Sequence, residues 1–362
     1  MATILAVGRF RGVASKALEQ ASRDVGFELT CVDGVEEALS WSESNAPHAL
    51  LLDSEGVDIE RACLGMRLQA RHARVPIMAV ATEVSELAFA ETFSCGGDDV
   101  VGFRVNSGLS ARLRRLPDSP WERPEQSAGK VALIVASERS RRVVLARVLG
   151  NAGYQIRFAV DLGEADEVAD EVTPRVVVVE TSSPDVKALV EKCAPRNLKT
   201  LWIVSTPPRT ARKHAGWISA VPNAALTDSF APPENVVFLA NELGRGTADD
   251  QRSSRRLLYG TIVGFRGAGR DQDDYGLTYN VSEGGLYVRS LAPPVEDRVW
   301  LELVPPRTER RVRLEAKVCW RRPYGPSNMA TVPPGFGVQI TDGAKAELEA
   351  WSRGYDSLAA DQ

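Results

Sequence analysis

The stretch YNVSEGGLYV, residues 279–288, decides how the last third of the chain folds. Its two ends are rich in aromatic and β-branched residues, which favour strands, whereas its middle holds a serine, a glutamate and two glycines. Adjacent glycines lose much backbone entropy on folding, so a strand that keeps them requires a reason. The pattern therefore indicates a strand that is interrupted in its middle.

Short alternating strands are predicted on both sides of this stretch. Runs such as LLYGTIVGF, RVWLELV, VRLEAKVCW and GFGVQI are separated by glycine and proline turns. Many short strands at regular spacing are typical of an antiparallel barrel or sandwich. Residues 342–355 have the pattern of a closing helix, with Asp342 as its candidate N-cap.

The first two thirds of the chain have a different pattern. Apolar runs at 3–8, 48–53 and 75–82 alternate with helical stretches, which indicates parallel strands covered on both faces. Similar runs recur at a nearly constant offset, at 131–137, 175–180 and 198–206. The sequence therefore predicts an internal duplication of one α/β domain.

Changes in composition mark the expected domain limits. Proline, serine and charge gather in LPDSPWERPEQSAGK, residues 116–130, and a second polar break follows the second repeat. The predicted division is an α/β domain at 1–116, a linker at 117–129, a second α/β domain at 130–243, a linker at 244–251, a β-barrel domain at 252–355 and a tail at 356–362.

Composition excludes several classes of protein. The 362 residues are 44% hydrophobic and 25% charged with a net charge of -4, so no global charge favours a nucleic-acid polymer or a membrane. No signal peptide or membrane-spanning run is present in the sequence. The five cysteines are scattered, which predicts reduced, buried thiols in a cytoplasmic protein. No histidine has metal-ligand spacing, and we expect no metal site.

Both α/β repeats resemble the receiver domains of bacterial response regulators, with a doubly wound, flavodoxin-like fold. The resemblance rests on element order and implies a phosphoacceptor at Asp53 in the first repeat, where the second repeat has Glu180. Phosphoryl transfer in receivers needs a metal held by acidic residues after the first strand, and this chain has Gly8 and Arg9 there. Asp53 is therefore a disfavoured phosphoacceptor, and we interpret both repeats as pseudo-receivers that bind proteins.

An arginine-rich segment precedes the barrel. QRSSRRLLYG, residues 251–260, holds Arg252, Arg255 and Arg256, and about two dozen residues later comes the NxSxxG pattern formed by Asn280, Ser282 and Gly285. RxxxR followed by (D/N)xSxxG resembles the signature of the PilZ family. That resemblance implies an antiparallel barrel with a C-terminal helix that binds cyclic di-GMP, a bacterial second messenger.

The resemblance also implies roles for individual residues. Arg252, Arg255 and Arg256 would bind phosphates and guanine edges, because guanidinium groups form bidentate hydrogen bonds with both. Asn280 and Ser282 would present polar groups to a guanine, while Gly284 and Gly285 would let the main chain turn and the ligand approach. Asparagine stands where aspartate is more common in the family, which removes one charged acceptor. Trp320 is a candidate stacking surface, although a plain strand end is favoured there.

The sequence thus predicts a non-enzymatic effector that binds cyclic di-GMP through residues 252–256 and 280–285. Two rivals stay open: a PilZ-like scaffold that binds no nucleotide, and a phosphorylation-driven response regulator that acts through Asp53. Residues 252–341 carry fourteen basic and nine acidic side chains, which suits an anionic ligand. The expected partners are cyclic di-GMP and unidentified proteins, with homodimer formation left open. Ligand is expected to order the arginine segment and change how the barrel sits against the second pseudo-receiver.

Overall fold

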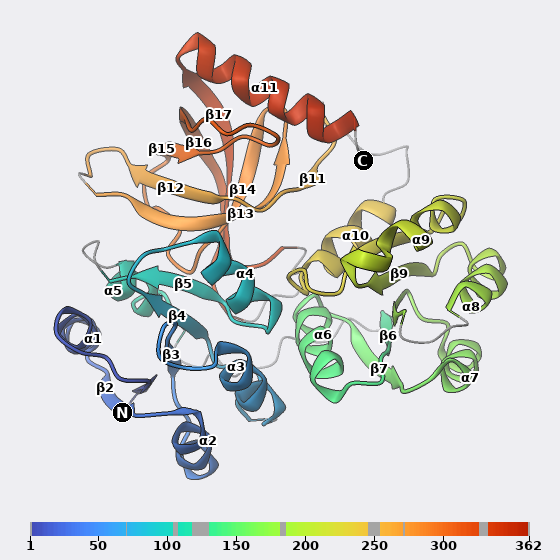
Figure 1. The fold of residues 1–362 in the computed structure, drawn as a ribbon, viewed down its shortest axis with the longest axis horizontal. Coiled ribbons are helices and arrows are strands. Elements are labelled where there is room, and N and C mark those ends of the chain that lie inside the picture. The colour runs from blue at the N-terminus through green and yellow to red at the C-terminus, as the bar shows by residue number, and fades with distance from the viewer. Residues whose placement is uncertain are drawn as a thin grey trace.

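The computed structural model describes residues 2–69, 71–103, 108–117, 130–181, 186–244, 254–270, 272–325 and 332–360. These residues fold into two α/β units and one β-barrel, which pack against one another (Figure 1). Among the described residues, no helix is both long enough and apolar enough to cross a membrane.

The first α/β unit is a five-stranded parallel sheet in the order β2-β1-β3-β4-β5. Leu5 and Val7 of β1 pack toward α2, α3 and α4, whereas Ile4 and Ala6 pack toward α1 and α5. Both faces of the sheet are buried, which explains why its strands are short apolar runs. The elements are β1 (Thr3–Val7), α1 (Val13–Val25), β2 (Glu28–Val32), α2 (Val35–Ser44), β3 (Ala49–Asp53), α3 (Ile59–Leu68), β4 (Ile77–Ala81), α4 (Glu86–Ser94), β5 (Asp99–Gly102) and α5 (Gly108–Leu113).

The second α/β unit repeats this arrangement, with strand order β10-β9-β8-β6-β7. Read from the other edge, it is the same 2-1-3-4-5 order, which is the flavodoxin-like form of the doubly wound fold. The predicted duplication and fold class are therefore confirmed. The elements are β6 (Val131–Val135), α6 (Arg139–Asn151), β7 (Gln155–Ala159), α7 (Leu162–Val172), β8 (Val176–Glu180), α8 (Val186–Cys193), a short 3-10 helix (Ala194–Arg196), β9 (Leu201–Thr206), α9 (Pro208–Ile218), β10 (Ala224–Asp228) and α10 (Asn235–Leu243).

The C-terminal unit is a closed antiparallel barrel, as predicted. Its six strands follow the order β13-β12-β15-β16-β17-β14, and pairing of β14 with β13 closes the ring. The short β11 pairs with the far end of β13. The strands are β11 (Leu257–Leu258), β12 (Ile262–Gly267), β13 (Asp274–Ser282), β14 (Gly285–Arg289), β15 (Arg298–Leu303), β16 (Val312–Arg322) and β17 (Gly335–Gly343).

Helix α11 (Lys345–Ala360) closes one end of the barrel and packs Trp351, Tyr355 and Leu358 into its core. The predicted N-cap at Asp342 was wrong. Asp342 lies in β17, because this strand stays paired with β16 as far as Gly343. The helix also extends beyond residue 355, into the segment expected to be a tail.

The cysteine environments differ from the prediction of uniformly buried thiols. Cys63 and Cys95 are buried in the core of the first α/β unit, whereas Cys31 and Cys319 are exposed. Cys31 lies on the edge strand β2, which has no neighbour on its outer side. Cys319 lies at a β-bulge in β16, where the register with β17 shifts between Val318 and Trp320.

Candidate nucleotide-binding pocket and domain junction

The opening stretch forms a β-hairpin. Strand β13 ends at Ser282, β14 begins at Gly285, and these two residues are paired across the turn. The Ser282 hydroxyl donates a hydrogen bond of 3.2 Å to the Gly285 carbonyl and so braces the turn. The predicted strand interruption is therefore a two-residue turn between neighbouring barrel strands.

The two glycines of this hairpin differ in the space that surrounds them. A Cβ atom at Gly285 would lie 2.1 Å from the Val338 carbonyl oxygen of β17, so only glycine lets these two strands pair this closely. A Cβ at Gly284 would meet no atom within 4 Å. Gly284 thus faces open space, which leaves room for a ligand at the hairpin tip.

A pocket of about 350 Å³ opens beside the hairpin. Arg256, Asn280, Ser282, Gly284 and Gly285 line it, so five of the predicted ligand residues meet at one cavity. Of the remaining two, Arg255 is exposed and is not among the lining residues, and Arg252 lies outside the described residues. The other lining residues are Ser254, Leu286, Tyr287, Cys319, Trp320, Gly337, Val338 and Gln339.

Aromatic side chains form one wall of this pocket. The Trp320 ring lies 5.2 Å from the Tyr287 ring and remains 39% exposed. A Cβ at Gly337 would lie 2.7 Å from Trp320 Nε1, so this glycine makes room for the indole. An exposed indole beside arginine and amide groups is able to stack on a nucleobase. The sequence offers Trp320 as a candidate stacking surface but favours a plain strand end there, and the structure places its ring at the pocket.

Two β-bulges flank the pocket and set which side chains face it. Tyr279 has no partner in the β13–β14 ladder, which passes from Thr278 directly to Asn280. Cys319 is skipped in the same way between β16 and β17, immediately before Trp320. Bulges re-aim the neighbouring side chains. Asn280 and Trp320, each the residue after a bulge, both line the pocket.

Helix α11 is hydrogen-bonded to both the hairpin turn and the arginine segment. Trp351 Nε1 donates a hydrogen bond of 2.7 Å to the Glu283 carbonyl in the hairpin turn. The Tyr355 hydroxyl donates one of 2.8 Å to the Arg255 carbonyl. The closing helix therefore fixes the arginine segment relative to the hairpin, a role that sequence reasoning missed.

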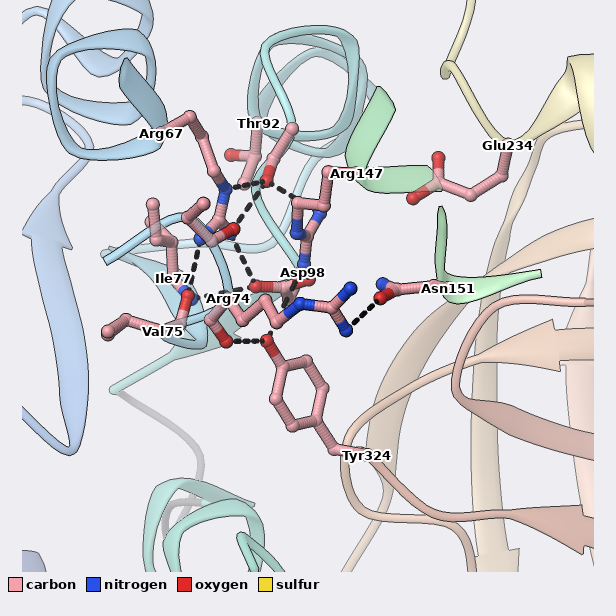
Figure 2. A network of polar contacts seen from close by, with 12 residues as sticks. Arg67, Arg74, Val75, Ile77, Thr92, Asp98, Arg147, Asn151, Glu234 and Tyr324 are labelled. Carbon is pink, nitrogen blue, oxygen red and sulfur yellow. Dashed lines mark hydrogen bonds and ion pairs between the residues drawn. The ribbon is translucent and has the colours of Figure 1, made fainter. Parts of the chain in front are cut away.

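A buried polar network joins the three units on another side of the barrel (Figure 2). Asp98 of the first unit accepts from Arg67 at 2.8 Å and also pairs with Arg147 of the second unit. The Tyr324 hydroxyl of the barrel donates to the Arg74 carbonyl at 2.7 Å. Figure 2 shows these side chains converging from all three units around Asp98.

A second set of ion pairs ties the first unit to the barrel. Arg112 pairs with Asp99 at 2.6 Å and with Asp274 of the barrel at 2.9 Å. The Leu291 backbone N–H of the barrel also donates to Asp99, at 2.8 Å. Local sequence patterns assign no role to Asp98 or Asp99. The structure gives both of them a role in joining domains.

The phosphoacceptor positions are occupied as follows. Asp53 ends β3, half-buried, and accepts a hydrogen bond of 3.2 Å from the Glu55 backbone N–H. Glu180 ends β8 and pairs with Arg141 of α6 at 3.0 Å. No group of three or more potential metal ligands occurs among the described residues.

The C-terminal part of the chain matches a known domain family. The sequence model of the PilZ domain matches residues 250–354. The solved inhibitor of motility MotI/DgrA of Bacillus subtilis is 18% identical, and the match covers 31% of this chain but only 53% of that chain, with a TM-score of 0.25. No curated protein matches the chain.

Two further solved structures are similar to single units of the chain. The chemotaxis response regulator CheY4 of Vibrio cholerae is 20% identical over 32% of this chain and 99% of that chain, with a TM-score of 0.28. The PilZ domain of CeSA from a cellulose-synthesizing bacterium is 18% identical over 29% of this chain and 99% of that chain, with a TM-score of 0.21. The family model thus identifies residues 250–354 as a PilZ domain, and two α/β units with the flavodoxin-like strand order precede it in the chain.

Proposed function

We propose that this chain is a non-enzymatic signalling effector that binds cyclic di-GMP in the pocket beside the β13–β14 hairpin. The observation that carries the proposal is the convergence of Arg256, Asn280, Ser282 and Gly284 on one cavity with the exposed ring of Trp320. Arginine pairs with phosphate or with the guanine edge, and the indole supplies a stacking face. Arg252, four residues before Arg256, would add a second guanidinium to this site.

Contacts around the pocket suggest how ligand binding in it affects the second receiver-like domain. Tyr287 lines the pocket and lies 6.2 Å from Tyr279, which in turn lies 5.9 Å from Phe238 of α10. The Tyr279 hydroxyl donates to the Glu234 carbonyl, just before α10, at 2.7 Å. The wall of the pocket is thus part of the contact between the barrel and the second receiver-like domain. This continuity supports ligand-dependent seating of the barrel on that domain.

The receiver-like domains serve in this proposal as protein-binding modules. The Arg141–Glu180 pair supports that role in the second domain. The carboxylate at the acceptor position is already held in an ion pair, so this domain has no need of phosphorylation in the proposed role. Incubation with acetyl phosphate and Mg²⁺ tests the rival reading. We expect no mass increase of one phosphoryl group, and a phosphorylated Asp53 would favour the response-regulator alternative.

Thermal shift with a nucleotide panel tests the proposed ligand. Cyclic di-GMP binds only the folded chain and is expected to raise the unfolding midpoint, with about 2.7 kcal/mol of added stability at a concentration 100 times Kd. GTP, GMP and cyclic di-AMP serve as matched controls and are expected to shift it little. An unchanged midpoint with every nucleotide would favour the scaffold alternative.

A further inference from the structure

The first receiver-like domain contains two cysteines that are buried in the same core. Cys63 on α3 and Cys95 at the end of α4 are both buried in the same apolar core, with exposures of 0% and 4%. The Cys95 sulfur lies 3.9 Å from the carbonyl of Ile59, one helical turn before Cys63 on α3. Cys95 also lies close to main-chain acceptors of its own helix, at 3.1 Å from the Glu91 carbonyl and 3.2 Å from the Thr92 carbonyl. The Ile59 contact places the Cys95 sulfur against α3, beside Cys63.

Cys95 has an approach route that Cys63 lacks. It lines a cavity of about 460 Å³ between the two receiver-like domains, together with Glu60 and Leu64 of the first domain and Arg141 and Phe230 of the second. A molecule of the size of hydrogen peroxide fits such a cavity. Cys63 is not among its lining residues, so Cys95 is the thiol that an incoming oxidant meets first.

The two thiols also differ in their readiness to ionise. The neighbouring Cys63 thiol lowers the pKa of Cys95, with further help from the Gly97 backbone N–H and the Arg67 guanidinium. The Cys95 thiol, followed by burial, raises the pKa of Cys63 well above its ordinary value. Because the thiolate is the nucleophile, Cys95 is the cysteine that reacts with the oxidant, and Cys63 is the resolving cysteine.

We propose that Cys63 and Cys95 are a redox-sensitive pair that hydroperoxides convert to a disulfide. The Cys95 thiolate attacks one peroxide oxygen, the O–O bond breaks, and the departing hydroxide takes a proton to form water, which leaves a sulfenic acid on Cys95. The Cys63 sulfur then attacks the Cys95 sulfur, the S–O bond breaks, and hydroxide leaves with the Cys63 proton as a second water. Two thiols are oxidised by two electrons, and one peroxide is reduced to two waters.

The position of this pair links it to the domain junction. Cys95 is followed directly by Gly96, whose carbonyl accepts from Arg67 at 2.8 Å and from Arg147 of the second domain at 3.2 Å. Asp98, at the centre of the network in Figure 2, is two residues further on. A disulfide at Cys95 would therefore form at the turn that holds the two receiver-like domains together. This modification is independent of the nucleotide pocket and does not rest on the proposed function.

Peptide mapping of the full chain after hydrogen peroxide treatment tests the pair. Trypsin separates Cys63 and Cys95 into the peptides 62–67 and 75–104, so their linkage gives one cross-linked peptide. In the folded wild type we expect about tenfold more of this linkage than of any linkage through the exposed Cys31 and Cys319. Dithiothreitol is expected to remove it.

Two comparisons sharpen the test. Cys63→Ser is expected to leave a sulfenic acid on Cys95 that dimedone traps, whereas Cys95→Ser is expected to leave Cys63 reduced. The proposal is overturned if Cys63 and Cys95 stay reduced while Cys31 and Cys319 oxidise. It is also overturned if the urea-unfolded chain forms the 63–95 linkage as readily as the folded one. Both outcomes are read on wild-type protein, so the test stands even where a variant does not fold.

Discussion

Asn280 is a proposed ligand residue whose position depends on a β-bulge. It is only 3% exposed, yet it lines the pocket, and the bulge at Tyr279 immediately precedes it. Trp320 occupies the matching position on β16, after the bulge at Cys319.

Asn280→Ala is expected to weaken cyclic di-GMP binding about tenfold, because one hydrogen-bonding group toward the guanine is lost. Asn280→Asp is expected to bind at least as tightly as the wild type, since a carboxylate accepts stronger hydrogen bonds from guanine N–H groups. Calorimetric titration measures both affinities. Equal affinity of the alanine variant and the wild type would remove Asn280 from the site.

His72 makes stability depend on pH. Burial lowers the pKa of its imidazole; Nε2 lies 2.8 Å from the Ser42 carbonyl, and buried Nδ1 has no hydrogen-bond partner among the described residues. The unfolded chain therefore binds a proton at higher pH than the folded one. The stability that His72 contributes is complete above its unfolded pKa of about 6.5 and is lost as pH falls below it.

We expect the thermal unfolding midpoint of the wild type to decrease as the pH is lowered from about 7.5 to about 5.5. In His72→Gln we expect the midpoint to depend less on pH, because glutamine keeps a hydrogen-bond donor but does not titrate. Scanning calorimetry across this range measures both slopes. His214→Gln is the comparison variant. Partial burial and Lys213 also lower the pKa of His214, but its imidazole is more exposed than that of His72, so we expect a smaller change of slope. An unchanged slope in His72→Gln would contradict this assignment.

At the scale of elements, the β13–β14 hairpin combines structural and binding demands within four residues. Gly285 lies against the β17 backbone, whereas Gly284 faces the pocket. Helix α11 holds the turn through Trp351 and the arginine segment through Tyr355. The hairpin, β17 and α11 therefore form one support for the proposed ligand residues.

The two glycines give a matched pair of variants. Gly285→Ala is expected to lower the free energy of unfolding by about 1–3 kcal/mol, because its Cβ would overlap the Val338 carbonyl. Gly284→Ala is expected to leave stability nearly unchanged and to weaken ligand binding, because its methyl group enters the pocket. Urea unfolding and calorimetric titration separate the two effects. Equal stability of the two variants would show that β14 and β17 do not pair as described.

At the scale of the whole molecule, buried charges join the three domains. Asp98 is held between Arg67 and Arg147, and all three side chains are almost fully inaccessible. Arg289 of the barrel also pairs with Glu234 of the second domain at 3.2 Å and lies 3.5 Å above the Phe93 ring of the first. Removal of one partner from such a buried ion pair strongly lowers the free energy of unfolding, because the remaining charge stays buried without its partner. We therefore expect the domains to unfold together.

Asp98→Ala is expected to destabilise the chain by about 3–5 kcal/mol, because Arg67 and Arg147 lose their shared carboxylate. Asp33→Ala is the matched control; it removes an ion pair with Arg9 in which both side chains are mostly exposed, and we expect little change. Urea unfolding followed by tryptophan fluorescence measures both. Separate transitions in the wild type, or equal midpoints for the two variants, would contradict a shared junction.

Local sequence patterns predicted the elements well but not the junction. Continuous apolar runs and their repetition were enough for the two parallel sheets, and the spacing of RxxxR and NxSxxG was enough for the barrel. The ion pairs of Arg112 with Asp274 and of Arg147 with Asp98 join residues far apart in the chain and in different domains. No local periodicity encodes such pairing, since it depends on how folded domains dock.

Tertiary contacts also explain the local errors. Asp342 has the residue type of an N-cap, but pairing with Glu315 of β16 keeps it in a strand. The bulges that place Asn280 and Trp320 at the pocket depend on strand pairing and are not visible in the sequence.

Calorimetric titration of cyclic di-GMP into the full chain, beside the Arg252→Ala/Arg256→Ala variant, tests the central claim most directly. We predict micromolar or tighter binding to the wild type and none to the folded double variant, because the guanidinium groups for phosphate and guanine are gone. Binding that persists in the double variant would move the site away from the pocket beside the hairpin. Absence of heat from the folded wild type would contradict a cyclic di-GMP receptor and leave a PilZ-fold scaffold.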